Sequence, residues 1–365
     1  MGFSEFHGNT EVVRRLREML ALDRFPHSVI LAGPPGAGKY TLALMLARAM
    51  NCQSPPSSSD RLPDFCGQCG NCRRIAESLD LDARVAEALE AREGLRDADK
   101  RETRILVQTH PDVLVIPPDP PQMMIKIDQV RHVNQTIHFK PAEGRRRIFI
   151  FTRAAFMKEA ANALLKTLEE PPESTAIFLL ARHPGELLAT TRSRSALFTL
   201  NRLGAEELER HLGEHRPEWN SRQRQLVSRL SDGAVGRALS FDLEQYIIAR
   251  KDALTLLNTA ARAGDHSDLF RTTETYRGGA EGKNKTDLLI AAVYSLLHDL
   301  MALSSGTPEL VRNTDVVSEL KSLSSAVDFD WIAQAAQQLV HVQSGMRRNL
   351  LRPLSLDALT LELER

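Results

Sequence analysis

Residues 28–51 read SVILAGPPGAGKYTLALMLARAMN and contain the pattern that decides the fold. The apolar run at 28–32 predicts a buried strand, and the run from Thr41 to Asn51 predicts a helix. Between them, Gly33 to Lys39 match the Walker A spacing, in which glycines let backbone N–H groups surround phosphate oxygens and a lysine reaches the outer phosphates. We therefore expect a nucleotide site made by Gly33, Pro34, Pro35, Gly36, Ala37, Gly38, Lys39, Tyr40 and Thr41.

Tyr40 departs from the usual pattern of this loop. It stands where Ser or Thr normally supplies a hydroxyl to Mg²⁺, and a phenol on a bulkier side chain is badly placed for that contact. Thr41 is adjacent but one position out of register. The loop therefore predicts binding of ATP or ADP with poor positioning of Mg²⁺.

Hydrolysis also requires a carboxylate at the end of a nearby strand. The expected strand is 148–151, and the residues after it, Thr152-Arg153-Ala154-Ala155, include no Asp or Glu. A competing strand at 113–116 is followed by Pro117-Pro118-Asp119, and its two prolines make a poor catalytic turn. We therefore expect no intrinsic ATPase activity.

All four cysteines lie close together in the sequence. Cys66-Gly-Gln-Cys69-Gly-Asn-Cys72 provides three thiolates at two-residue gaps, and Cys52 supplies a fourth. Four sulfur ligands favour tetrahedral zinc and leave no open position for catalysis. We expect a structural Zn²⁺ site made by Cys52, Cys66, Cys69 and Cys72; free buried cysteines and an iron–sulfur cluster are the alternatives.

The order of the remaining patterns predicts the fold class. Apolar strands at 113–116, 147–151 and 175–180 alternate with helices, which is typical of a parallel sheet covered on both faces. From Gly204 onward helical patterns dominate. We expect an α/β P-loop domain at 1–202, with the zinc module at 52–72 and a charged helical insertion at 76–104, followed by a small helical domain at 203–245 and a larger one at 246–365.

The overall composition indicates a globular protein of several domains. The chain has 365 residues, 42% of them hydrophobic and 26% charged, which is too long for one ordinary core. Lys plus Arg equals Asp plus Glu at 47 each, so any DNA contact has to be local. The turn Arg145–Arg147 is one candidate, with a solvated basic turn as the alternative. The N-terminus resembles no secretion signal and no run looks long enough to span a bilayer, which predicts a cytoplasmic protein.

Several runs together resemble the clamp-loader branch of the AAA+ ATPases, which in bacteria belongs to DNA polymerase III. They are Phe25-Pro26-His27, GPPGAGK, the cysteine module, His110-Pro111-Asp112, NALLKTLEEPP at 162–172 and Ser193-Arg194-Ser195. The run at 162–172 is the most discriminating, and Ser193–Ser195 departs from the family's Ser-Arg-Cys only at its last residue. The gamma/tau ATPase subunits keep an Asp-Glu pair where this chain has Thr152-Arg153, so the likeness is to the non-motor subunits.

The resemblance implies an architecture and a set of partners. The helical regions 203–245 and 246–365 would be a lid and a collar, the latter joining five subunits into a ring. The implied partners are the gamma/tau and delta subunits, the sliding clamp, and primed DNA through the complex. The implied function is to support ATP-dependent loading of the clamp.

The same resemblance implies a role for Arg194 as an arginine finger in the ATP site of the adjacent gamma/tau subunit. In the lid, Gly236 takes the place expected for a second arginine sensor and Arg237 follows it. Two rival interpretations stay open: an active gamma/tau-like motor, and a zinc-containing DNA-binding regulator.

Overall fold

The computed structural model describes residues 2–57, 60–96, 99–100, 103–120, 122–262, 266–276, 279–346 and 352–364. Parts of the expected insertion (97–98 and 101–102) and of the expected larger helical domain (263–265, 277–278, 347–351 and 365) lie outside the described residues. The chain forms two compact units. The first comprises residues 1–203 with 234–236, and the second comprises 204–233 with 237–365.

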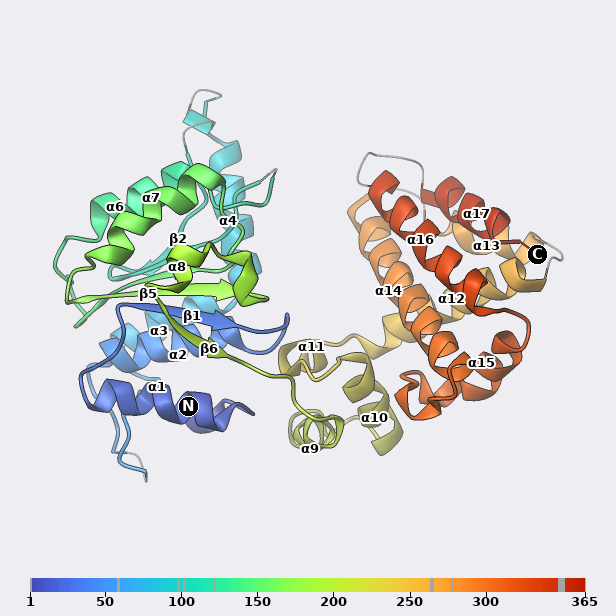
Figure 1. Ribbon diagram of the computed structural model, residues 1–365, viewed down its shortest axis with the longest axis horizontal. Coiled ribbons are helices and arrows are strands. Elements are labelled where there is room, and N and C mark those ends of the chain that lie inside the picture. The colour runs from blue at the N-terminus through green and yellow to red at the C-terminus, as the bar shows by residue number, and fades with distance from the viewer. Residues whose placement is uncertain are drawn as a thin grey trace. The chain divides into compact units, whose positions relative to one another are not determined.

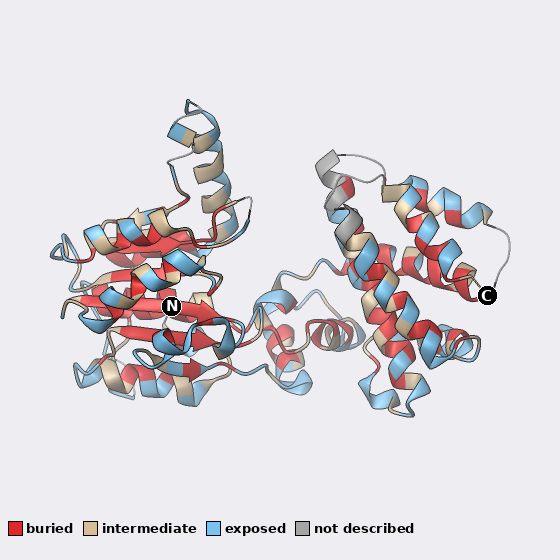
Figure 2. Ribbon diagram, turned by 45° about the horizontal axis from the view of Figure 1, so that its top comes forward, coloured by how far each residue is buried: buried red, intermediate tan, exposed pale blue. Residues whose placement is uncertain are grey.

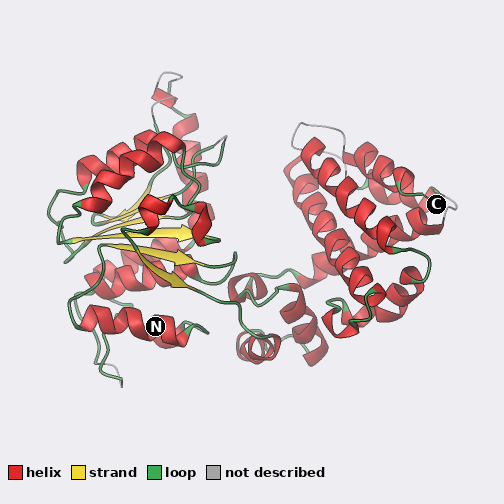
Figure 3. Ribbon diagram, viewed as in Figure 1, coloured by secondary structure: helices red, strands yellow, loops and turns green. Residues whose placement is uncertain are grey.

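A six-stranded sheet forms the centre of the first unit, in the order β2-β3-β4-β5-β1-β6 (Figures 1 and 3). The strands are β1 (Ser28–Ala32), β2 (Val107–His110), β3 (Val113–Ile116), β4 (Arg147–Phe151), β5 (Thr175–Ala181) and β6 (Ala196–Thr199). All neighbours from β3 to β6 are parallel, which confirms the predicted α/β class. Strand β2, which was not predicted from the sequence, runs antiparallel to β3 at the edge of this otherwise parallel sheet. Only two residues join β2 to β3, too few for the crossover that a parallel pair needs.

Helices cover both faces of this sheet, and Figure 2 shows its strands as largely buried. Along β1, Val29 and Leu31 pack on one face, while Ile30 and Ala32 pack on the other. The first face is covered by α1 (Thr10–Ala21), α2 (Lys39–Asn51) and α3 (Gly70–Ala76), and the second by α6 (Ile127–Thr136) and α7 (Lys158–Glu169). Burial on both faces explains why β1, β3 and β5 are apolar runs.

Two buried polar side chains hold the loop that precedes β4. The carboxylate of Asp112 accepts hydrogen bonds from the backbone N–H groups of residues 142, 143 and 144 at 2.7, 2.8 and 2.7 Å. Burial alone would raise the pKa of Asp112, but these three donors outweigh it and lower the pKa. The amide of Asn51, at the end of α2, accepts from the N–H groups of residues 145 and 146 and donates to the carbonyl of residue 146, each at 2.9 Å.

The described part of the insertion contains η2 (Glu77–Leu79) and α4 (Leu81–Glu93), of which α4 has no buried residue. Arg92 near the end of α4 pairs with Asp119 at 3.0 Å, and Lys126 pairs with the same carboxylate at 2.7 Å. Asp119 is fully buried. This carboxylate follows the competing strand β3, and its two internal cations indicate a structural role.

Helices make up the second unit, as predicted from residue 204 onward. They are α9 (Ala205–His215), α10 (Ser221–Leu230), α12 (Leu243–Arg262), α13 (Ser267–Glu274), α14 (Gly279–Ser304), α15 (Val317–Ser324), α16 (Phe329–Met346) and α17 (Arg352–Glu362), with single turns η4 (Pro308–Leu310) and η5 (Thr314–Val316). Helix α11 (Val235–Leu239) has residues in both units. The division of this region into a lid and a collar stays a prediction.

One segment of α14, Asn284–Ser304, is long and apolar enough to cross a membrane. This corrects the expectation that no run reaches that length. Within its apolar window, 61% is buried inside the structure, where α14 packs against α12 and α16. Neighbouring helices cover most of this window, so packing in the helical unit accounts for much of its apolar composition.

Candidate nucleotide site, zinc site and arginine finger

The phosphate-binding loop lies between the end of β1 and the start of α2. Gly33, Gly36 and Gly38 have φ angles of 150°, 79° and 80°, a region that favours glycine. A Cβ atom on Gly33 would lie 2.4 Å from the carbonyl oxygen of Leu200, and one on Gly38 would lie 2.8 Å from the ring of Phe6. The shape and close packing of the loop therefore require glycine at Gly33 and Gly38, apart from any role in phosphate binding.

Lys39 closes back onto the loop that it follows. Its Nζ atom donates to the carbonyl oxygens of Gly33 and Pro34 at 2.6 and 2.7 Å. Burial lowers the pKa of Lys39 to about 8; the nearby charge of Glu186 opposes this shift, and Arg182 adds to it. Binding of a nucleotide would require Lys39 to exchange these carbonyl oxygens for phosphate oxygens.

Tyr40 makes its hydrogen bond with a distant part of the first unit. The phenol donates to the carbonyl oxygen of Ser78, in η2, at 2.6 Å. Burial raises the pKa of Tyr40, so the hydroxyl stays protonated and remains a donor. The side chain at the usual Mg²⁺-ligand position is therefore engaged with the turn that follows the cysteine module.

Gly236 lies beside the phosphate-binding loop. A Cβ atom built on Gly236 would be 3.8 Å from the carbonyl oxygen of Gly36. The family resemblance predicts an arginine sensor at this position. Glycine has no side chain, so it places no positive charge beside the loop. Nucleotide sensing by Arg237 stays a prediction.

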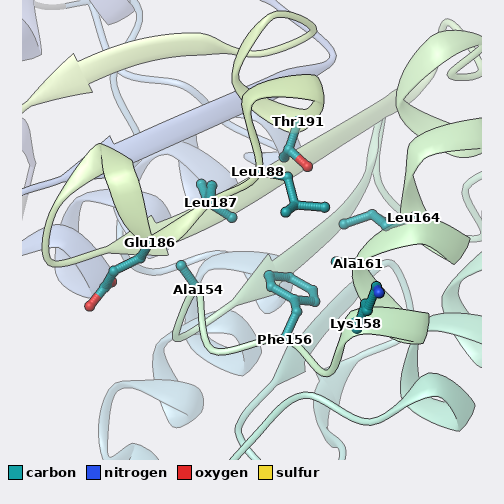
Figure 4. A pocket seen from close by; sticks show the side chains of 9 residues that line it. All are labelled: Ala154, Phe156, Lys158, Ala161, Leu164, Glu186, Leu187, Leu188 and Thr191. Atoms are coloured by element: carbon teal, nitrogen blue, oxygen red, sulfur yellow. The ribbon is translucent and has the colours of Figure 1, made fainter.

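An apolar cavity of about 240 Å³ adjoins the turn after β4 (Figure 4). It lies between that turn, helix α7 and the segment with η3 (Pro184–Glu186) and α8 (Ala189–Arg192), and its lining comprises Ala154, Phe156, Lys158, Ala161, Leu164, Glu186, Leu187, Leu188 and Thr191. The carboxylate among them, Glu186, accepts a hydrogen bond from the backbone N–H of Arg182 at 2.9 Å. The turn after β4 thus contributes Ala154 and Phe156 to this cavity rather than the acidic pair of a hydrolase.

The four predicted zinc ligands come together in the fold. The sulfur atoms of Cys52, Cys66, Cys69 and Cys72 all lie within 4.8 Å of one another. A tetrahedron with Zn–S bonds of about 2.3 Å has edges of about 3.8 Å, so this cluster fits zinc after small adjustments. Two backbone N–H groups already donate to ligand sulfurs at 3.3 Å, from Cys66 to Cys52 and from Cys69 to Cys66.

The pKa shifts within the cluster show what a metal would add. A backbone hydrogen bond from Cys69 lowers the pKa of Cys66. Burial opposes ionisation of Cys69, but hydrogen bonds from backbone and side-chain groups outweigh it and lower its pKa to about 6. Burial raises the pKa of Cys52 and of Cys72. A divalent metal would supply the positive charge that stabilises these two buried sulfurs as thiolates.

Arg194 lies in the turn between α8 and β6. Its Nη1 atom donates to the carbonyl of Thr190 at 3.0 Å and to Oγ of Ser193 at 3.2 Å, while Nη2 pairs with Glu169 at 2.7 Å. The arginine side chain is 36% exposed. Arg194 is therefore at the surface, in a defined position, and its action as a finger stays a prediction.

Ser195 stands where the family has cysteine. Its hydroxyl donates to the carbonyl of Thr191 at 2.9 Å and lies 2.8 Å from the hydroxyl of Ser28 on β1. The hydroxyl of Ser195 therefore connects this turn with β1, the strand that precedes the phosphate-binding loop.

The basic turn Arg145–Arg147 has internal partners. Arg146 pairs with Asp23 at 2.9 Å, and the guanidinium of Arg147 lies 5.8 and 6.0 Å from the ring centroids of Phe139 and Phe149. These contacts favour a structural role for two of the three arginines. Arg145 is exposed and donates from Nη2 to the carbonyl oxygen of Cys52 at 3.5 Å, and its contact with DNA stays a prediction.

Comparison with known proteins identifies relatives at modest identity. Over 342 residues the chain is 26% identical to the tau subunit of DNA polymerase III from Salmonella typhimurium, covering 92% of this chain and 42% of that protein. It is 26% identical over 339 residues to the delta-prime subunit from Escherichia coli, covering 89% and 86%. A delta-prime subunit from Pseudomonas aeruginosa is 31% identical over 169 residues, which cover 46% of this chain and 41% of that protein. The chain thus spans 42% of the length of the tau relative.

Two solved structures align with most of this chain. A gamma subunit-related protein from Thermotoga maritima aligns over 96% of this chain and 98% of its own, at 17% identity and a TM-score of 0.42. The clamp loader delta protein of Bacillus subtilis aligns over 96% and 99%, at 11% identity and a TM-score of 0.33.

A family model matches residues 8–204, which is more than half of the chain and contains the phosphate loop, the cysteine cluster and Arg194. This match and the two delta-prime relatives confirm the predicted resemblance to the clamp-loader subunits of DNA polymerase III, and within them to delta-prime. The chain belongs to the family described as DNA polymerase III, delta subunit.

Proposed function

We propose that the chain is a non-motor clamp-loader subunit of the delta-prime type, which supports ATP-dependent loading of the sliding clamp onto primed DNA. It works in the cytoplasm, in a five-subunit ring with gamma/tau and delta subunits, and meets primed DNA through that complex. One observation carries the proposal: the phosphate loop Gly33–Lys39 is retained, while β4 is followed by Thr152-Arg153 without a carboxylate. Family membership and the delta-prime relatives support it.

Arg194 is the residue through which this subunit acts on ATP. A guanidinium is always charged and presents several donors, so it suits a transferring phosphoryl group on a neighbouring subunit. The partial exposure of Arg194 and its position in a short turn support this role.

The two cofactor sites have different tasks in this proposal. Zinc held by Cys52, Cys66, Cys69 and Cys72 has four sulfur ligands, so it contributes to folding and leaves no position for a substrate. ATP or ADP at residues 33–41 is bound but not hydrolysed. The engagement of Tyr40 with Ser78 supports weak dependence on Mg²⁺.

The test is ATP turnover by a ring reconstituted with gamma/tau and delta subunits, the clamp and primed DNA. Arg194→Ala should lower turnover and clamp loading while ring assembly is unchanged, because an arginine finger contributes about 10³-fold or more at the site it serves. Arg192→Ala, at an exposed arginine two residues away, is the matched control. Unchanged turnover in the Arg194→Ala ring would refute the finger.

The second candidate function is an active gamma/tau-like motor. The tau relative, which matches 92% of this chain, favours it. The isolated chain distinguishes the two: ATP turnover that disappears on Lys39→Ala would establish a motor and overturn the non-motor proposal.

A further inference from the structure

We propose that Glu169 is a positioning residue that holds Arg194 ready for the neighbouring subunit's ATP. This inference rests on the proposed trans role of Arg194. The two side chains form an ion pair between Oε1 of Glu169 and Nη2 of Arg194 at 2.7 Å. They lie on different elements, the end of α7 and the turn after α8, so their contact fixes one element against the other.

The contacts of Arg194 divide into local and distant ones. The bonds to Thr190 and Ser193 come from its own turn and move with that turn. Glu169 precedes Arg194 by 25 residues and belongs to a helix whose inner face is packed in the core through Ala160, Leu164 and Leu168. The carboxylate therefore ties the guanidinium to a rigid part of the first unit.

The end of α7 is an unusual place for a stabilising carboxylate. Glu169 is the last residue of the helix, where the negative end of the helix dipole disfavours an anion. Pro171 and Pro172 follow and prevent the helix from continuing. Helix stability alone would favour a cation at this position, so the carboxylate is better explained by its partner Arg194.

The geometry also leaves donors for a phosphate. A guanidinium has five N–H donors, and the three contacts with Thr190, Ser193 and Glu169 engage three of them. Two donors remain for oxygen atoms of a neighbouring nucleotide. Glu169 thus restricts the orientation of the guanidinium and leaves some of its N–H donors for a phosphate. A positioning group requires this combination.

The test uses the reconstituted ring with the clamp and primed DNA. Glu169→Ala should lower kcat for ATP turnover about two- to fivefold, the range expected for a partly exposed ion pair, with KM for ATP unchanged because only transition-state contacts are affected. Glu169→Gln keeps an acceptor oxygen for Nη2 and should restore part of the loss. Glu170→Gln removes the same charge one residue away and should behave as wild type.

A double-substitution cycle separates this role from general stability. Combining Glu169→Ala with Arg194→Ala should be no worse than Arg194→Ala alone, because both changes remove one function. Additive losses, an unchanged kcat or a raised kcat in the Glu169→Ala ring would each overturn the inference. If Arg194→Ala itself has no effect, the proposed finger fails instead. Thermal melting and zinc content of each variant identify any that fail to fold, and Glu169→Gln then carries the test.

Discussion

The buried carboxylate of Asp112 leads to a sharp prediction about the stability of the first unit. It accepts three backbone N–H groups, and a hydrogen bond to a charged group contributes about 1.5–3 kcal/mol. Asp112→Ala leaves all three donors without this acceptor, which should lower the free energy of unfolding by about 5 kcal/mol. Asp112→Asn keeps one oxygen, which can serve the two donors that bond to Oδ2, and should cost about 3 kcal/mol.

Urea unfolding measures this effect, and the chain contains its own control. Trp219 and Trp331 both lie in the second unit, so tryptophan fluorescence follows that unit. Zinc release follows the first unit, which contains all four cysteines. The free energy of unfolding of a unit of this size falls by about 3 kcal/mol per M urea. A loss of about 3 kcal/mol in Asp112→Asn should therefore lower the unfolding midpoint of the first unit by about 1 M urea, while the midpoint that tryptophan fluorescence reports for the second unit should not change.

The pH dependence has a defined sign. The pKa of Asp112 is lowered in the folded state, so its stabilisation is complete above the ordinary carboxyl pKa and is lost as the pH falls through the lowered value. The difference between wild type and Asp112→Asn should therefore shrink below about pH 4. Glu143→Gln, which changes an exposed carboxylate in the same loop, is the control and should have little effect. An unchanged midpoint in Asp112→Asn at neutral pH would refute the reasoning.

Three further predictions concern the zinc and nucleotide sites. Cys69→Ser should remove one equivalent of zinc by metal analysis and lower the melting temperature of the first unit; a metal-free variant that melts like wild type would contradict a structural zinc. Because the pKa of Lys39 is lowered to about 8, the charge that attracts phosphate is lost from that pH rather than near 10.5. Binding of labelled ADP, followed by fluorescence polarisation, should weaken as the pH rises through 8, whereas Lys39→Arg, which stays charged, should show a flat profile. Tyr40→Phe removes the hydrogen bond to the carbonyl of Ser78 and should lower the free energy of unfolding by about 1 kcal/mol. Tyr40→Thr should make the affinity for ADP depend on Mg²⁺, which calorimetry with and without the ion would show.

Much of the fold could be predicted because its signals are local. The phosphate loop and cysteine cluster have fixed spacings, and strands β3, β4 and β5 are continuous apolar runs. The two edge strands gave no such signal. β2 reads Val-Gln-Thr-His and β6 reads Ala-Leu-Phe-Thr, each with exposed positions, because an edge strand is covered less completely.

The contacts of the candidate site residues could not be predicted in the same way. The bond from Tyr40 to Ser78 joins residues 38 apart, and the pair of Glu169 with Arg194 joins two elements whose approach depends on the packed sheet. Local sequence gives no distance across such separations. The sequence did locate Arg194 and the phenol at the metal-ligand position, but only the structure gives their partners.

The hydrogen bonds between the Asn51 side chain and the backbone of residues 145 and 146 connect parts of the chain that are synthesised at different times. Asn51 leaves the ribosome next to the first zinc ligand, yet the backbone that its side chain binds follows 94 and 95 residues later. At about 5–20 residues per second, that interval lasts about 5–20 s. The four cysteines, complete by Cys72, are therefore available to a metal before the loop that Asn51 holds has been synthesised. A zinc module can therefore form during translation, before β4 joins the sheet.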